Sequence, residues 1–138
     1  MAAPLIRIEV ITPERTVLWD RTESIIAPAL DGYLGIQANH APMVAGLRAG
    51  VLFYGPVGAE KRRMAISGGF LEVADNHVTI LADTAELAHE IDVERAERAL
   101  RRAEKRLRDF SSDVDRIRAE FALNRAMARL QAAGRKVY

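Results

Sequence analysis

Residues 78–100 read VTILADTAELAHEIDVERAERAL, and within this stretch the period of the apolar positions changes from that of a strand to that of a helix. Val78, Ile80 and Ala82 alternate with residues that are expected to face outward, a pattern typical of a half-buried strand. From Val93 onward the apolar positions follow helical spacing. The sequence therefore predicts a β part before this change and a helical part after it.

The same alternation runs back from this stretch to Leu5. Short segments recur about every eight to twelve residues, and turn signals separate them. These signals are Asp31-Gly32, Gly55-Pro56, Gly58, Gly68-Gly69 and Asp75-Asn76. Many short strands at this spacing predict a β-sandwich, or flattened barrel, of about ten strands.

The helical part begins with a heptad-like stripe of apolar residues. The stripe consists of Val93, Ala96, Leu100, Ala103 and Leu107. Asp92 is the predicted N-cap, because its carboxylate can accept a hydrogen bond from the first turn, and Glu94 suits the positive end of the helix dipole. The pattern breaks at Ser111-Ser112, so we expect this helix to end there.

A second helix is predicted after this break, with Asp113 as its N-cap and Gly134 as its stop. Its apolar residues are Val114, Ile117, Phe121, Leu123, Met127 and Leu130. Both helices are rich in alanine, so their backbones can approach closely across a seam that buries little area. We therefore expect an α+β protein, with a β-sandwich over residues 1–87 and an antiparallel two-helix hairpin over residues 88–138.

Charge is distributed unevenly along the 138 residues, although the formal net charge is only +1. Residues 1–90 contain 7 Lys and Arg against 11 Asp and Glu, whereas residues 91–138 contain 13 against 8. The absence of cysteine excludes a disulfide scaffold. Arg7 and Glu9 interrupt the first apolar run, so we expect no signal peptide. No run approaches the ~20 apolar residues of a membrane span.

The first helix is crowded with arginine. Its guanidinium groups belong to Arg95, Arg98, Arg101, Arg102, Arg106 and Arg108. If the hairpin turns near residues 111–112, Arg95 lies opposite Arg129, and Arg102 lies within about a turn of Arg125. Four guanidinium groups then line one side of the seam between the helices, where a compact polyphosphate would satisfy them.

Two other interpretations of the arginines stay open at this point. The first is a solvated face whose charge is neutralised by Glu94, Glu97, Glu104 and Glu120. The second is a nucleic-acid surface, because basic helices attract phosphate backbones. The second half of the chain has few aromatic residues, no nucleic-acid motif and interspersed acids, which makes that interpretation the weaker one.

Four motifs occur in a fixed order along the chain. They are DGYLGI (31–36), NHAP (39–42), ISGGFLEV (66–73) and DTAE (83–86). Through them the chain resembles the epsilon subunits of bacterial F-type ATP synthases over essentially its full length. The resemblance implies a non-catalytic rotor subunit whose sandwich docks onto the gamma subunit and the c-ring. It also implies that the hairpin, when extended, inhibits ATP hydrolysis by meeting the beta subunits of the catalytic hexamer.

The resemblance further implies a peripheral location on the cytoplasmic side of the cell membrane, reached only through the complex. Whether the coupling ion is H⁺ or Na⁺ stays open. The alternative function is a free-standing nucleotide- or nucleic-acid-binding module, which would form no stable complex with a gamma-like coiled coil.

Residues 91–96, IDVERA, match the Ile/Leu-Asp-x-x-Arg-Ala motif with which bacillus-type members of this family bind ATP. The resemblance implies ATP as a regulatory ligand, with Mg²⁺ as an optional companion, that stabilises the folded-down hairpin. The implied ATP-binding residues are Glu86, Ile91, Asp92, Arg95, Ala96, Arg102, Arg125 and Arg129. Glu86, Ile91 and Asp92 are assigned to the adenosine end and the arginines to the phosphates. The link at residues 88–90 lacks the stiffening proline expected there.

Other candidate sites are weak. His40 has no neighbouring nucleophile or carboxylate in sequence, and the NHAP segment favours a structural turn. His77 and His89 have no metal-ligand spacing with each other or with His40. No glycine-rich segment has the phosphate-loop pattern, so we expect neither a catalytic residue nor a metal site, and no ATP hydrolysis by this chain.

Overall fold

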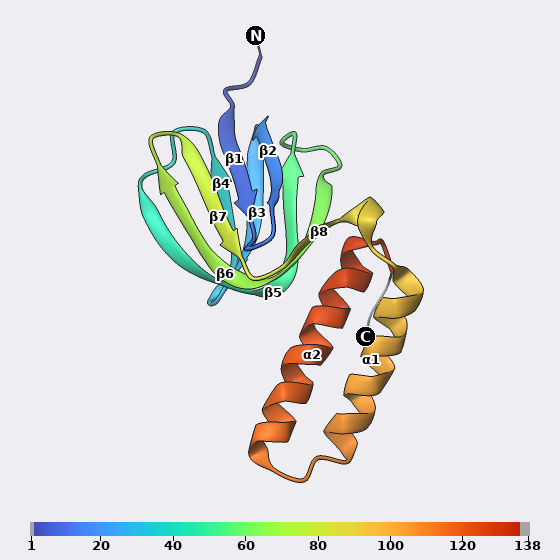
Figure 1. Ribbon diagram of the computed structural model, residues 1–138. Coiled ribbons are helices and arrows are strands. Elements are labelled where there is room, and N and C mark those ends of the chain that lie inside the picture. The colour runs from blue at the N-terminus through green and yellow to red at the C-terminus, as the bar shows by residue number, and fades with distance from the viewer. Residues whose placement is uncertain (1, 136–138) are drawn as a thin grey trace.

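The computed structural model describes residues 2–135, which form eight strands followed by two antiparallel helices (Figure 1). Residues 136–138, the end of the predicted helical unit, lie outside the described residues. The strands are β1 (Ile6–Ile11), β2 (Thr16–Thr22), β3 (Ser24–Ala29), β4 (Gly32–Gln37), β5 (Met43–Gly55), β6 (Arg62–Ala74), β7 (His77–Ala82) and β8 (Ala85–Leu87). A 3₁₀ turn η1 (Ala88–Glu90) then leads to helices α1 (Val93–Arg108) and α2 (Asp113–Ala132).

The strands form one sheet that folds over into two layers, which makes the predicted sandwich. The sheet order is β2-β1-β7-β6-β5-β3-β4, with β8 also pairing with β6. All pairings are antiparallel except that of β1 with β7. The 13-residue strands β5 and β6 belong to both layers, because β7 pairs with the end of β6 whereas β8 pairs with its beginning.

The strand count differs from the expected ten, because residues 2–135 contain eight strands. The turn predicted at Gly68-Gly69 is instead a bend inside β6, where these glycines adopt φ angles of 117° and 129°. Opposite this bend, the register of β5 pairs Leu47 with Gly69 and then Ala49 with Ser67. Each long strand therefore crosses from one layer to the other without a turn and serves as a strand in both.

The core lies between the two layers and consists of aliphatic side chains from alternate strand positions. Ile6, Ile8, Ile25, Leu52, Met64, Leu71, Val78 and Ile80 are all 0% exposed. Their burial confirms that the period-two pattern marks the face of each strand that points inward. Burying this apolar area is the main favourable term that holds the sandwich together.

Local capping explains the helix boundaries, with one change from the prediction. Asp92 caps α1 as predicted, since its side chain accepts a hydrogen bond of 3.1 Å from the Arg95 backbone N–H. For α2 the N-cap is Ser112 and not Asp113: the Ser112 hydroxyl accepts from the Asp115 N–H, and Asp113 is the first helical residue. Gly134 ends the second helix with a φ of 86°, as predicted.

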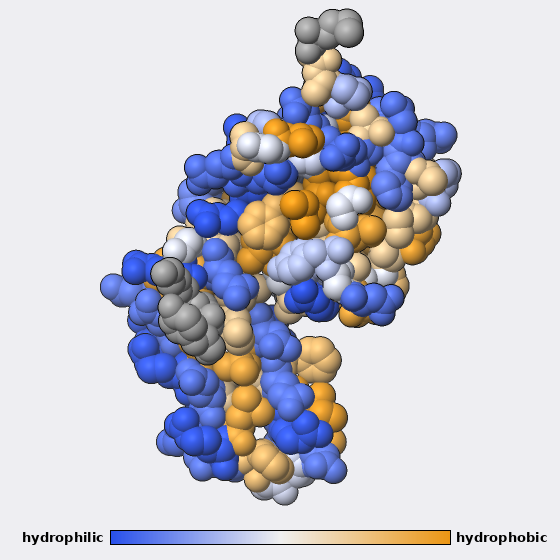
Figure 2. All heavy atoms as spheres, turned by 180° about the vertical axis from the view of Figure 1, so that it is seen from behind, coloured by the Kyte–Doolittle hydropathy of each residue, from blue (hydrophilic) through white to orange (hydrophobic). Residues whose placement is uncertain are grey.

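The two helices meet through small residues. Ala96 and Ala103 of α1, and Ala119 and Ala126 of α2, are at most 2% exposed. Seen from behind, a narrow line of apolar atoms runs between the helices, and a second apolar group lies at the outer edge of the hairpin, beyond a strip of hydrophilic side chains (Figure 2). The alanine-rich seam is therefore close-packed but buries little apolar area, as the sequence predicts.

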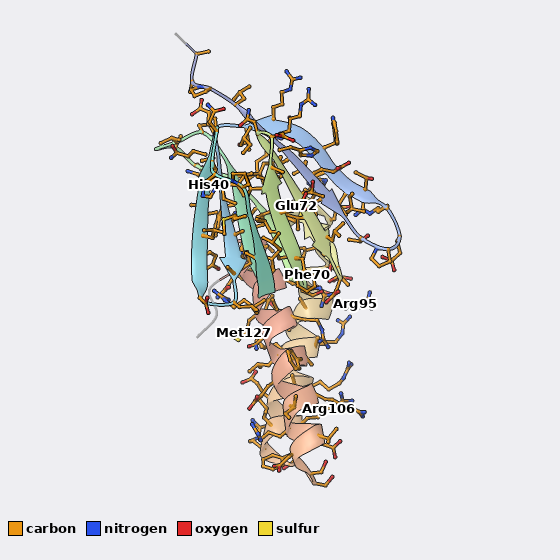
Figure 3. The ribbon with its side chains drawn as sticks, turned by 90° about the vertical axis from the view of Figure 1, so that its left-hand side faces the viewer. His40, Phe70, Glu72, Arg95, Arg106 and Met127 are labelled. Atoms are coloured by element: carbon orange, nitrogen blue, oxygen red, sulfur yellow. The ribbon has the colours of Figure 1, made fainter. Side chains whose placement is uncertain are left out.

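Only one end of the hairpin rests on the sandwich. A second buried cluster joins the C-terminal part of α2, through Ala128 and Ala132, to Val51 of β5 and Ala65 of β6, with Ile91 beside them. The rest of the hairpin projects away from the sheet, so that Arg106 lies far from the sandwich and Arg95 next to it (Figure 3). Neither helix within residues 2–135 is long and apolar enough to cross a membrane.

Candidate nucleotide site

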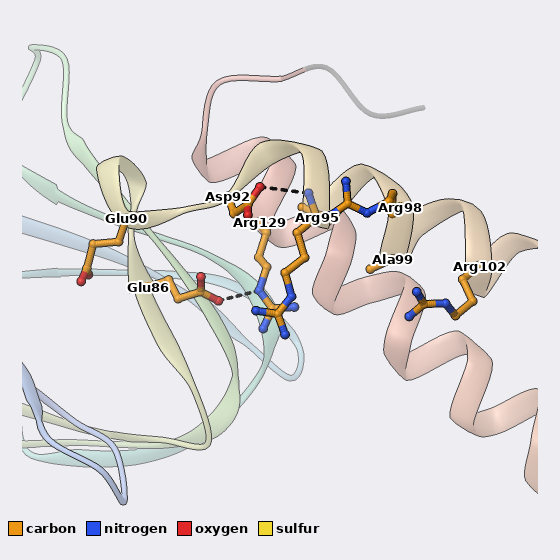
Figure 4. Close-up of a pocket in the computed structure, with 9 residues that line it drawn as sticks. Glu86, Glu90, Asp92, Arg95, Arg98, Ala99, Arg102 and Arg129 are labelled. Carbon is orange, nitrogen blue, oxygen red and sulfur yellow. Dashed lines mark hydrogen bonds and ion pairs between the residues drawn. The ribbon is translucent and has the colours of Figure 1, made fainter.

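A cavity of about 650 Å³ lies where the sandwich, α1 and α2 meet (Figure 4). Its lining residues are Glu86, Glu90, Asp92, Arg95, Ala96, Arg98, Ala99, Arg102 and Arg129. They come from β8, the linker and both helices, so a ligand here would touch every element that meets at the junction. The volume is in the range of small-molecule sites.

An ion pair across the cavity joins the sandwich to α2. The Arg129 Nε of α2 donates to the Glu86 carboxylate of β8 at 2.5 Å, and both side chains are about 30% exposed. This contact holds the C-terminal part of α2 against the strand that leads into the linker. It also fixes one guanidinium group at the cavity before any ligand arrives.

Helical geometry places the other arginines along one edge of the cavity. Asp92 starts α1 at the rim, and the spacing of three and four residues then puts Arg95, Arg98 and Arg102 on one side of the helix (Figure 4). Ala96 and Ala99 lie between them and leave room for a ligand, because their side chains are small.

The three arginines of α1 have no acidic partner within residues 2–135, since none of the ion pairs there involves Arg95, Arg98 or Arg102. Glu120, one of the acids expected to neutralise them, pairs with Arg116 at 2.7 Å. Like charges at this spacing repel by roughly 0.2–0.5 kcal/mol per pair. An anion bound in the cavity would relieve this repulsion and accept several charge-assisted hydrogen bonds.

Glu90 is held at the edge of the cavity by two donors. Its carboxylate accepts a hydrogen bond of 3.1 Å from the Leu87 backbone N–H, and it pairs with Arg15 at 3.0 Å. The Leu87 N–H, and after it the Arg15 guanidinium, lower the pKa of Glu90 below its usual value. Glu90 is therefore an anion whose hydrogen bonds are directed away from the arginines of α1.

Most of the residues predicted to bind ATP come together in this cavity. Six of them line it: Glu86, Asp92, Arg95, Ala96, Arg102 and Arg129. Ile91 does not line it and is packed in the cluster between α2 and the sheet, and Arg125 is not among the lining residues either. The predicted proximity of Arg95 and Arg129 agrees with this geometry.

Glu90, Arg98 and Ala99 line the cavity but were not among the predicted residues. The spacing of Arg98 from Arg95, and of Ala99 from Ala96, is one helical turn, so helical periodicity alone could have indicated both. No sequence signal indicated Glu90, because its position depends on the path of the linker.

The histidines show no sign of a metal site. His40 lies in the predicted turn, where its backbone N–H donates to the Gln37 carbonyl at 3.2 Å. Within residues 2–135 no group of three or more His, Asp or Glu side chains is arranged to hold a metal ion.

The cavity where the sandwich, α1 and α2 meet has the chemistry to bind and orient a polyanion, because Arg95, Arg98, Arg102 and Arg129 line it.

Comparison with known proteins identifies the family. The beta-sandwich domain of the ATP synthase delta/epsilon chain matches residues 5–88, and the long alpha-helix domain of that chain matches residues 89–134. The ATP synthase epsilon chain of Symbiobacterium thermophilum is 58% identical over 128 residues, covering 92% of this chain and 91% of the relative. That of Syntrophomonas wolfei is 50% identical over 133 residues, covering 96% and 97%.

A solved structure agrees with these relatives. A chain in the cryo-EM structure of Euglena gracilis mitochondrial ATP synthase, OSCP/F1/c-ring in rotational state 1, superposes with a TM-score of 0.79 at 29% identity. The match covers 96% of this chain and 84% of that one. The chain therefore belongs to the ATP synthase delta/epsilon chain family, and the predicted resemblance to epsilon subunits is confirmed.

Proposed function

We propose that this epsilon chain works in the rotor of an F-type ATP synthase and that ATP, bound at the junction cavity, stabilises its folded hairpin. The observation that supports the proposal most strongly is the composition of the cavity. Three guanidinium groups of α1 without acidic partners in the described chain face a fourth, from α2, that is tied to the sandwich. A polyphosphate chain between them would link both helices to β8.

The proposed role of each residue follows from its place in the cavity. Glu86 and Asp92, at the sandwich end, take the adenosine, with Ile91 supporting them from the buried cluster. Arg95, Arg102 and Arg129 take the phosphates. Arg125, which does not line the cavity in this structure, is also proposed to contact the phosphates, and Mg²⁺ can accompany them.

Binding at a junction is an efficient way to control a hairpin that is held weakly. A ligand that binds only the folded form stabilises that form by about 2.7 kcal/mol at a hundred times its dissociation constant. The alanine-rich seam and the single contact with the sheet leave the folded form open to control by an energy of this size. Without ATP, repulsion among the arginines favours release of the helices.

The released helices are proposed to inhibit ATP hydrolysis. Helices of 16 and 20 residues span about 24 and 30 Å, so in an extended arrangement they reach about 60 Å along a gamma coiled coil. Their basic side chains would then meet acidic surfaces on the beta subunits. The chain itself carries out no catalysis in this scheme.

The sandwich is proposed to dock onto the gamma subunit and the c-ring. Several large apolar side chains are more than half exposed on it, including Leu30, Val44, Phe70 and Leu81, and apolar atoms gather over the middle of the face seen in Figure 2. Exposed apolar area of this kind is typical of an interaction surface. Through these partners the chain would lie at the cytoplasmic side of the cell membrane.

Titration calorimetry of the full chain with ATP tests the nucleotide proposal. We expect saturable binding of one ATP per chain. Because the sequence contains no cysteine, the substitutions Glu60→Cys, in the turn between β5 and β6, and Gln131→Cys, at the exposed C-terminal part of α2, can carry a fluorophore pair. ATP should raise the energy transfer between them, because the folded hairpin holds this part of α2 against β5 and β6. A chain that binds no ATP, or whose hairpin does not respond to it, would overturn the proposal.

Co-purification tests the rotor proposal independently. A rotor subunit forms a stable complex with the gamma subunit, whereas the alternative, a free-standing nucleotide- or nucleic-acid-binding module, does not. Removal of the hairpin from the assembled enzyme should accelerate ATP hydrolysis. Unchanged hydrolysis would rule out the inhibitory function while leaving the rotor assignment in place.

A further inference from the structure

The linker between β8 and α1 determines the position of the α1 side of the cavity relative to its β8 side. Glu86 lies on β8, Asp92 caps α1, and only residues 87–91 join them. No proline restricts residues 87–91, so the linker needs another restraint if the site is to be ordered before the ligand binds.

Glu90 supplies part of this restraint within the linker. Its side chain accepts the Leu87 backbone N–H at 3.1 Å and so closes the 3₁₀ turn on itself. The same carboxylate receives the Arg15 Nη2 atom on both oxygens, at 3.0 and 3.1 Å. Arg15 is 75 residues away in sequence and belongs to the turn between β1 and β2.

Arg15 is itself anchored to the sandwich. The Thr12 backbone N–H donates to the Arg15 carbonyl at 2.9 Å, and the Arg15 N–H donates to the Thr12 hydroxyl oxygen at 3.3 Å. Thr12 is 8% exposed, so the turn that carries Arg15 is seated in the sheet. The guanidinium group thus projects from a fixed point of the sandwich onto the linker.

We propose that Arg15 is a positioning residue for the nucleotide site: it ties the linker to the β1–β2 turn and holds the start of α1 opposite Glu86. Arg15 does not line the cavity, so it acts through Glu90 and through the path of residues 87–91. The ion pair replaces the covalent stiffness that a proline would give. This inference rests on the proposed function, because the site that it orders is the ATP site.

Calorimetric titration of the full chain with ATP tests the inference in the variants Arg15→Gln and Arg15→Lys. Arg15→Gln should weaken ATP binding about two- to fivefold, the range expected for a partly exposed ion pair. Arg15→Lys should retain most of the affinity, because a single nitrogen of Arg15 makes both contacts with Glu90. The control is Arg21→Gln, an exposed arginine on β2 that forms no ion pair within residues 2–135, and its affinity should equal that of the wild type.

Hydrogen exchange of the Leu87 amide gives a readout that needs no nucleotide. This amide donates to Glu90, so it should exchange faster in Arg15→Gln and at the wild-type rate in Arg15→Lys and Arg21→Gln. The melting temperature should hardly change in any variant, which separates a positioning effect from general destabilisation.

The outcomes distinguish the inference from the function on which it rests. If the wild type binds ATP and Arg15→Gln binds it equally well, the inference is overturned. If the wild type binds no ATP, the proposed function fails. In that case unchanged Leu87 exchange in Arg15→Gln overturns the restraint itself, and faster exchange supports it.

Discussion

At the scale of single residues, the cavity is defined by where charge is matched and where it is not. Arg129 and Arg15 each have a carboxylate partner, whereas Arg95, Arg98 and Arg102 have none within residues 2–135. Matched pairs hold the junction together, and unmatched guanidinium groups are available to a ligand. Neighbouring arginines of α1 should therefore differ in their contribution to ligand binding.

Arg102→Ala should weaken ATP binding about tenfold, because it removes a charged hydrogen-bond donor from the part of the cavity that is proposed to hold the phosphates. Arg101→Ala is the matched control, since Arg101 is the adjacent exposed residue and does not line the cavity. Calorimetry on both variants decides the matter. Equal affinities for the two variants would show that total helix charge, and not the cavity, attracts the nucleotide.

Glu90 gives a prediction for pH. Hydrogen bonds from Leu87 and Arg15 lower its pKa below the ordinary value of 4.5, so the folded state prefers the ionised form. The resulting stabilisation is complete above pH 4.5 and is lost as the pH falls through the lowered pKa. Glu90→Gln should therefore lower the melting temperature slightly at pH 7, and this difference from the wild type should shrink as the pH falls below 4.5 and through the lowered pKa. A difference that stays the same over the whole pH range would contradict this assignment.

At the scale of elements, small residues allow two close approaches, one within the sheet and one between the helices. In β6, a Cβ added at Gly69 would lie 2.0 Å from the Leu81 carbonyl oxygen, at a φ of 129°. In the hairpin, Ala103 and Ala126 are 1% and 0% exposed. The bend of the sheet and the seam of the hairpin both depend on the absence of larger side chains.

Gly69→Ala should destabilise the fold by about 3 kcal/mol or more, since it combines backbone strain with a clash against the backbone of β7. Gly35→Ala in β4 is the control, because a Cβ there meets no atom within 4 Å. Denaturant unfolding measures both variants. A Gly69→Ala protein as stable as Gly35→Ala would mean that the sheet does not need this bend.

Ala103→Leu should destabilise the hairpin by about 1–3 kcal/mol by forcing the helices apart. Glu104→Leu adds a leucine to an exposed neighbouring position of α1 and should change the stability by less than about 0.5 kcal/mol. Hydrogen exchange of the backbone amides of α1 and α2 measures the loss of hairpin stability. If these amides are as protected in Ala103→Leu as in the wild type, the seam is not tightly packed.

At the scale of the whole molecule, the sandwich has a complete core of its own. The hairpin, in contrast, buries part of its apolar surface against the sheet. The cluster around Ala128 and Ala132 needs Val51 and Ala65 of the strands, but the core between the two layers contains no helical residue. The sandwich can therefore be stable alone, and the hairpin can leave it without unfolding it.

A chain ending at Glu90 should fold as a sandwich and retain the Arg15–Glu90 pair, but it should bind no ATP because α1 and α2 are missing. Circular dichroism tests whether the shortened chain folds, and calorimetry tests whether it binds ATP. ATP binding by the shortened chain would place the nucleotide outside the junction. The full-length chain measured in parallel is the control.

Much of this arrangement was predictable from sequence. Alternation of apolar residues identified the strands, and the stripe from Val93 to Leu107 identified α1, because local periodicity directly reflects which side of an element is buried. Asp92 was recognisable as a cap for the same local reason. The strand count was less predictable, because Gly68-Gly69 permits a bend as readily as a turn, and only the pairing partners of β6 distinguish them.

Local sequence patterns therefore specify the order of the elements, their inward faces and the gathering of arginines on α1, because all of these depend on neighbours within a few residues. Local patterns do not specify that β5 and β6 serve both layers, that Glu86 pairs with Arg129, or that Arg15 reaches Glu90; the folded structure shows all three. These features join residues far apart in the chain. They arise from the pairing of the strands, the packing of α2 onto the sheet and the path of the linker, none of which a local pattern specifies.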